Sequence, residues 1–71
     1  MADLKWVRKK RGQFIVWITD TPKGRFRVQT CFPGRPTCNA GHDGKTWMQY
    51  FDNEQRAKAF CQQQYNRMET P

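Results

Sequence analysis

Two stretches of alternating hydrophobic and polar residues, 13–20 and 25–32, follow one another in the first half of the chain. Alternation with a period of two is typical of β-strands, and both stretches are rich in β-branched and aromatic residues. The segment TDTPKG between them carries a proline and a glycine, the residues that a tight turn favours. The pattern therefore predicts a β-hairpin.

Each strand of this hairpin has one face that we expect to be buried. That face carries the residues Phe14, Val16, Ile18, Phe26, Val28, Thr30 and Phe32. The opposite face should be solvated, and it carries Gln13, Ile15, Trp17, Thr19, Arg25, Arg27, Gln29 and Cys31. The alternation thus predicts a tryptophan and two arginines on the outside of the sheet.

Less regular segments complete the predicted sheet. Residues 4–9 can form a short first strand, which Gly12 would interrupt. Residues 33–44, PGRPTCNAGHDG, hold five of the glycines and prolines without apolar periodicity, which predicts a long loop. Residues 45–51 then predict a last strand, and its short pattern leaves open which face is buried.

The C-terminal residues 52–68 predict a helix. Asp52 is the expected N-cap, and Gln55 follows three positions later as in a capping box. An apolar stripe recurs at helical spacing and consists of Ala57, Phe60, Cys61, Gln64 and Met68. This stripe needs an apolar partner surface, which the inner face of the hairpin can supply.

These elements predict an α+β domain, an antiparallel three- to four-stranded β-meander packed on one C-terminal α-helix. We expect a single small domain over residues 1–71. It consists of a basic N-terminal segment (1–12), the meander (13–51, with the loop 33–44) and the helix (52–68). One helix covers only one face of a sheet, so the other face is expected to stay open.

Positive charge is concentrated outside the predicted helix. The chain has 13 Lys and Arg, 6 Asp and Glu and a formal net charge of +7, and residues 1–49 hold ten of the basic and three of the acidic side chains. Such an excess is typical of proteins that bind polyanions. Arg and Lys neutralise phosphates, Arg and Gln bond to base edges, and Trp packs on bases. The candidate nucleic-acid contacts are Arg8, Lys9, Lys10, Arg11, Gln13, Trp17, Arg25, Arg27, Gln29 and Lys45.

Two segments carry a resemblance to a known type of DNA-binding domain, WVRKKRGQFIVWITD and YFDNEQRAKAFCQQQYNRM. They resemble the three-stranded-sheet-plus-helix domains of plant ethylene-response transcription factors and of the arm-binding N-terminus of phage integrases. The first is similar to the basic opening strand and the alternating strand after it, the second to the Phe-Asp helix start. The resemblance implies a sheet lying in the major groove, with contacts from Arg8, Lys10, Trp17, Arg25 and Arg27.

The sequence offers little for catalysis or metal binding. It has one histidine, His42, and no phosphate-binding glycine loop, nucleophile motif or paired carboxylates. Cys31, Cys38 and His42 are spaced Cys-x6-Cys-x3-His, wider than the knuckle of a structural zinc site, and Cys61 is distant. An odd number of cysteines without a signal peptide is typical of reduced thiols. We predict no enzyme activity, no metal and no cofactor.

The sequence therefore predicts non-enzymatic binding of nucleic acid, with double-stranded DNA as the first choice and a phage or mobile-element regulator as the context. Two alternatives stay open: a small regulator or inhibitor that docks on an acidic surface of a host protein, and a binder of RNA or single strands. No apolar run approaches the roughly 20 residues of a membrane span. No apolar segment follows the basic residues of MADLKWVRKK, so we do not expect this stretch to be a signal peptide. We expect a cytoplasmic protein without a membrane partner, and its oligomeric state is left open.

Overall fold

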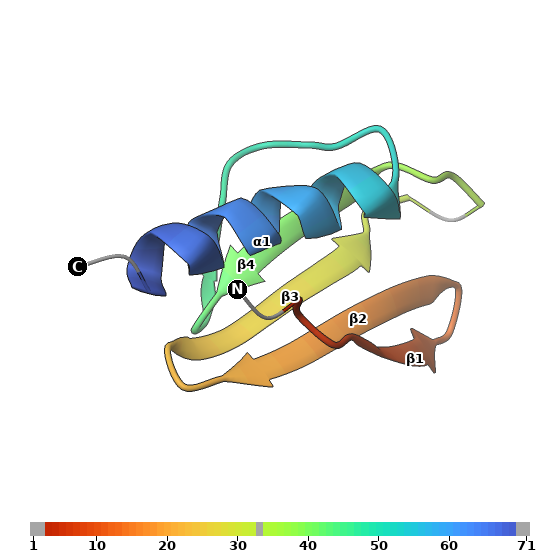
Figure 1. Ribbon diagram of the computed structural model, residues 1–71. Helices are drawn as coiled ribbons and strands as arrows, with labels where there is room; N and C mark the ends of the chain where they lie inside the picture. The colour runs from red at the N-terminus through yellow and green to blue at the C-terminus, as the bar shows by residue number, and fades with distance from the viewer. Residues whose placement is uncertain (1–2, 33, 70–71) are drawn as a thin grey trace.

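Five antiparallel strands and one helix form the part of the chain that the structure, a computed structural model, describes, residues 3–32 and 34–69 (Figure 1). Met1, Ala2, Pro33, Thr70 and Pro71, which fall within the predicted domain, lie outside the described residues. The strands are neighbours in chain order: β1 (Val7–Arg11), β2 (Phe14–Thr21), β3 (Gly24–Thr30), β4 (Cys38–His42) and β5 (Lys45–Thr46). The helix α1 (Glu54–Glu69) lies across one face of the sheet, against β3 and β4. The predicted α+β class is confirmed, with five strands in place of three or four.

The turn between β2 and β3 decides which residues face the helix. Thr21 pairs with Gly24 across a two-residue turn, and this register sets Trp17 opposite Val28. Directly opposed residues project from the same face of a sheet, so Trp17 joins Val28 in the core. The prediction that the helix covers Phe14, Val16 and Ile18 is wrong, because a shift of one residue exchanges the two faces of a strand.

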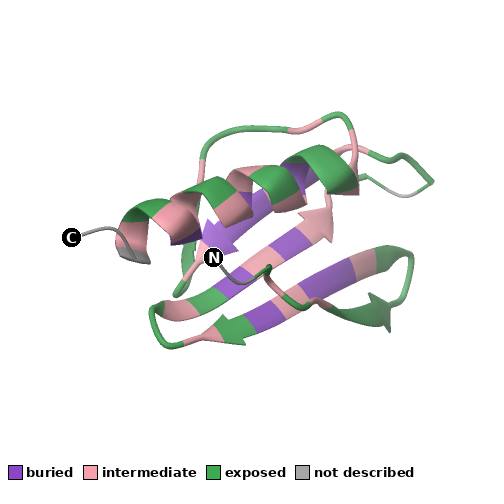
Figure 2. Ribbon diagram, in the orientation of Figure 1, coloured by how far each residue is buried: buried purple, intermediate pink, exposed green. Residues whose placement is uncertain are grey.

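The core lies between α1 and the strands β2 to β4 (Figure 2). Its buried members are Trp17, Phe26, Val28, Cys38, Ala40, Ala57, Cys61 and Tyr65. From the predicted helix stripe, Ala57 and Cys61 are confirmed as buried, whereas Phe60, Gln64 and Met68 are half-buried. Tyr65 completes the buried stripe, since residues four positions apart lie on one face of a helix.

Residues 3–6 close the core on the helix side of β2. The Leu4 amide donates a hydrogen bond to Gln62 Oε1 at 2.8 Å. Above the sheet, the Lys58 ammonium lies 5.0 Å from the centroid of the Trp17 ring and 6.0 Å from that of Trp6. The helix side of β2 to β4 is therefore covered, while no element in the described ranges covers the opposite face.

Three strand predictions need correction. The possible first strand exists as β1, but it begins at Val7 rather than at residue 4. The loop predicted over 33–44 is wrong for Cys38–His42, which pair with β3 as the strand β4. The last strand, predicted over 45–51, is limited to β5: after Thr46 the Trp47 amide still donates to the Ala40 carbonyl, and Phe51 returns to the sheet as an isolated bridge with Cys38.

The helix begins after Asn53, one residue later than a cap at Asp52 would require. Asn53 Oδ1 accepts a hydrogen bond from the Arg56 amide at 3.0 Å, which is the contact of an N-cap side chain with the third helical residue. The predicted capping pair of Asp52 and Gln55 is therefore wrong. The end of the helix at Glu69 lies next to the predicted end at residue 68.

Candidate nucleic-acid interface

The face of the sheet that points away from α1, called the open face below, holds half of the predicted contacts. Strand alternation and register assign to it Val7, Lys9, Arg11, Phe14, Val16, Ile18, Asp20, Arg25, Arg27, Gln29, Asn39 and Gly41. Five of these residues belong to the predicted set: Lys9, Arg11, Arg25, Arg27 and Gln29. The open face is therefore a polar and basic surface with an apolar strip, β2, running through it.

The middle of the open face carries hydrogen-bonding groups that the protein itself leaves unused. Arg27 pairs with Gly41, and its Nη2 donates to Thr46 Oγ1 at 3.0 Å. Gly41 leaves room for the guanidinium, since a Cβ at this position would lie 3.2 Å from Arg27 Nη2. Arg27 Nε and Asn39 Oδ1 are buried and have no hydrogen-bond partner among the described residues. Buried polar atoms are nearly always paired, so these two atoms are an exception at the polar centre of the open face.

At one end of the open face, the charged side chains pair with one another. The Arg25 Nε donates to Asp20 Oδ1 at 2.6 Å, and this hydrogen bond holds the pKa of Asp20 below its usual value. The Arg25 amide in turn donates to Asp43 Oδ1 at 2.9 Å. Asp20 compensates the charge of the Arg25 guanidinium and Asp43 adds a carboxylate at the Arg25 backbone, so this end has no excess of positive charge to offer to a phosphate.

The other end of the open face is aromatic. The side chains of Phe14, Phe32 and Tyr50 are 39%, 48% and 68% exposed, and the ring centroids of Phe32 and Tyr50 lie 6.3 Å apart. Together with Arg11 and Asn39 they line a cleft of about 480 Å³. Sequence reasoning missed these rings, because it placed Phe14 and Phe32 on the buried face, which is wrong, and treated Tyr50 as part of a regular strand.

The edge strand β1 brings four cations together. All five of its residues are exposed, and none is acidic. Lys9 and Arg11 project from the open face, whereas Arg8 and Lys10 project from the other face of the strand. Because α1 covers β3 and β4 only, the cations on both faces of β1 are open to solvent.

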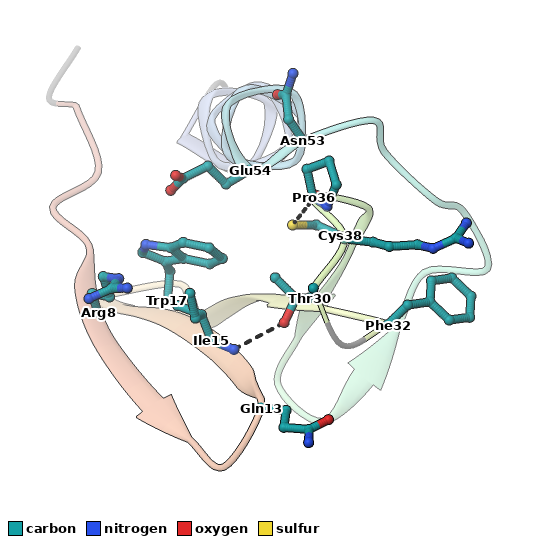
Figure 3. A pocket seen from close by; sticks show the side chains of 12 residues that line it. Arg8, Gln13, Ile15, Trp17, Thr30, Phe32, Pro36, Cys38, Asn53 and Glu54 are labelled. Atoms are coloured by element: carbon teal, nitrogen blue, oxygen red, sulfur yellow. Dashed lines mark hydrogen bonds between the residues drawn. The ribbon is translucent and has the colours of Figure 1, made fainter.

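The remaining predicted contacts lie apart from the open face. Arg8, Gln13 and Trp17 line a separate cavity of about 500 Å³ on the helix side, where Figure 3 shows the Trp17 ring pointing toward Glu54 at the start of α1. Trp17 is only 7% exposed, so the prediction of an exposed tryptophan is wrong, as the register of the hairpin requires. Lys45 is exposed on β5, at the edge of the sheet opposite to β1.

The three cysteines form no disulfide, and burial makes their thiols poorly reactive. Burial raises the pKa of Cys38 to about 11 and that of Cys61 to about 12, and it raises the pKa of Cys31 as well. Cys31 follows β3 and lines the aromatic cleft. Within residues 3–32 and 34–69, no three His, Cys, Asp or Glu side chains come together in a way that could hold a metal ion.

Comparisons with protein-family models, with curated proteins and with solved structures found no match for this chain. Among the described residues, no helix has the length and the apolar character needed to cross a membrane. The functional proposal therefore rests on the residues of the open face and of β1.

Proposed function

We propose that the protein binds duplex DNA through the open face and catalyses no reaction. The observation that carries this proposal is an uncovered sheet face with cations on its edge strand β1 and, across β2, the polar side chains of Arg27, Gln29 and Asn39 on β3 and β4. Phosphates are the ligands of the cations, and base edges are the ligands of the polar atoms.

Phosphate contacts come from β1. Lys9 and Arg11 extend from the open face, and Arg8 and Lys10 extend from the opposite side of the same strand. Each phosphate that is neutralised releases counterions, so binding weakens as salt rises, with a slope of about −0.9 per contact in log K against log salt. Arg25 contributes little to this term because Asp20 and Asp43 surround it.

Base contacts come from the centre of the open face. Arg27, Gln29 and Asn39 present a guanidinium and two neighbouring amides, and Gln29 lies directly opposite Asn39. Arg bonds to the acceptors of guanine, and Gln or Asn bonds to adenine, in a major groove about 12 Å wide that admits a β-ribbon. The resemblance to the ethylene-response and integrase domains implies this same placement of a sheet, although the buried Trp17 takes no part in it.

Cations on an edge strand also have a simpler explanation, since they prevent unwanted pairing between sheets. This explanation applies to β1 but not to Arg27, which belongs to β3 in the interior of the sheet. A half-buried arginine with an unpartnered Nε adds nothing to edge protection. The arrangement of Arg27, Gln29 and Asn39 therefore favours a binding role.

The test is a titration of a labelled random-sequence duplex with the protein, in which fluorescence anisotropy measures binding at several salt concentrations. The double variant Lys9→Ala/Arg11→Ala should bind more weakly, and its salt slope should be shallower by about 1.8, the value for two lost phosphate contacts. The matched control is Arg56→Ala/Arg67→Ala, which removes the same charge from exposed positions of α1. This control should keep the slope of the wild-type protein.

Two results would contradict the proposal. Absence of duplex binding at low salt would exclude it, and equal slopes for both double variants would show that only net charge matters. Absence of duplex binding would support the alternative function, a regulator that docks on an acidic protein surface. The exposed side chains of Met48 and Tyr50 suit that alternative, since large apolar and aromatic groups dominate protein interfaces.

A further inference from the structure

We infer that the aromatic cleft of the open face holds one unpaired DNA base beside the bound duplex. This inference rests on the proposed function, and it adds a ligand that fully paired DNA does not offer. The residues that carry it are Arg11, Phe14, Gln29, Phe32, Asn39 and Tyr50, all of which line the cleft.

The walls of the cleft favour stacking. Three rings, Phe14, Phe32 and Tyr50, are exposed to 39%, 48% and 68%, although aromatic side chains of this size normally bury most of their surface. Phe32 and Tyr50 contact each other in a tilted arrangement with 6.3 Å between their centroids and leave their outer surfaces open. Bases stack on such rings in proteins that bind unpaired nucleotides.

The floor of the cleft favours a base over another flat apolar group. Asn39 Oδ1 is buried there without a hydrogen-bond partner among the described residues, and the Gln29 side chain projects directly beside it. Asn39 and Gln29 both line the cleft, and side-chain amides of this kind can pair with the edge of an adenine. An apolar side chain from a protein partner would remove these polar side chains from water without pairing them, at a cost in binding.

Charge and size agree with a nucleotide. Arg11 lies directly opposite Phe14 in the β1–β2 register, so its guanidinium can hold the phosphate next to a base that stacks on Phe14. The volume of about 480 Å³ falls in the range of about 300–1,000 Å³ typical of small-ligand sites. A base inside a duplex has both faces and its pairing edge covered by neighbours, so only an extruded base can enter the cleft.

The experiment compares three duplexes of one sequence: fully paired, with a single unpaired adenine, and with an abasic residue in place of that adenine. We expect the unpaired adenine to raise affinity by about 5- to 150-fold over the paired duplex, the range that stacking of one base on aromatic side chains supports. The abasic duplex, which has the same flexible backbone, should bind like the paired one. Phe32→Leu/Tyr50→Leu should remove the preference and retain the affinity for paired DNA.

Met48→Leu is the matched control, since Met48 is fully exposed in the same segment but does not line the cleft. Circular dichroism spectra verify that each variant is folded. Equal affinity for adenine-bulged and abasic duplexes would overturn the inference and leave duplex binding intact. A single strand of the same sequence serves as a fourth probe. If the protein binds this strand but not the paired duplex, the result would support base binding in the cleft and overturn the proposed duplex binding. Absence of binding to every probe would overturn both.

Discussion

Replacing Trp17 with alanine should destabilise the fold rather than remove a DNA contact. The side chain is 7% exposed, packs in the core and lies 5.0 Å below the Lys58 ammonium. Truncation of a buried aromatic residue to alanine lowers the free energy of unfolding by about 3–5 kcal/mol. Loss of the cation–π contact adds about 0.5–1 kcal/mol. A domain of this length has a total stability of about 4–11 kcal/mol, so the variant loses a large part of it.

Urea denaturation followed by far-ultraviolet circular dichroism measures this loss. Trp17→Phe keeps a ring in the core and should lose less stability than Trp17→Ala. Met48→Ala is the surface control, with a change of at most about 0.5 kcal/mol because its side chain is fully exposed. If Trp17→Ala unfolded at the same urea concentration as the wild-type protein and yet bound DNA more weakly, the register that buries Trp17 would be refuted.

Three further predictions concern the helix cap, the thiols and acid stability. Asn53→Ala should lower the free energy of unfolding by about 1 kcal/mol, as measured by thermal melts, whereas Asn53→Asp should keep the cap. Iodoacetamide at mildly alkaline pH should alkylate Cys31 first and Cys61 last, because burial raises the pKa of Cys61 to about 12. Bound DNA should slow the reaction of Cys31, which mass spectrometry of peptides would detect. The pKa of Asp20 is lower in the folded than in the unfolded chain, so its ion pair stabilises the fold fully above the ordinary carboxyl pKa of about 3.9. This contribution disappears as the pH falls through the lowered pKa, and Asp20→Asn should lack that part of the acid dependence in an unfolding titration.

The order of the elements could be predicted where the sequence pattern is long. The hairpin over 13–32 and the C-terminal helix each have enough apolar periodicity to be recognised, whereas β4 does not. Two residues of β4, Cys38 and Ala40, are 1% exposed and face α1, where only small side chains fit beneath the helix. Small residues give a weak hydrophobic signal, and backbone pairing with β3 defines the strand instead.

The exposed side of β2 could not be predicted from hydrophobicity. Both of its faces are apolar, with Ile15 and Trp17 on one and Val16 and Ile18 on the other. The two-residue turn makes the choice, because it sets the pairing of Thr21 with Gly24 and all pairs before it. An alternating pattern alone divides the residues of a strand between two faces, and the turn determines which face packs against the helix.

The exchange of faces also explains how an apolar strip can lie on a basic surface. Val16 points away from α1 and is nevertheless only 8% exposed, because the strands on either side place Lys9 and Gln29 directly opposite it. Long side chains of this kind cover apolar surface with their aliphatic stems and hold their polar ends in water. The charged and polar ends of these side chains are thereby raised above the sheet. The register that removes Trp17 from this surface brings Phe14 to it, next to Arg11. The combination of ring and cation that the sequence indicated is therefore present on the open face, with a different ring.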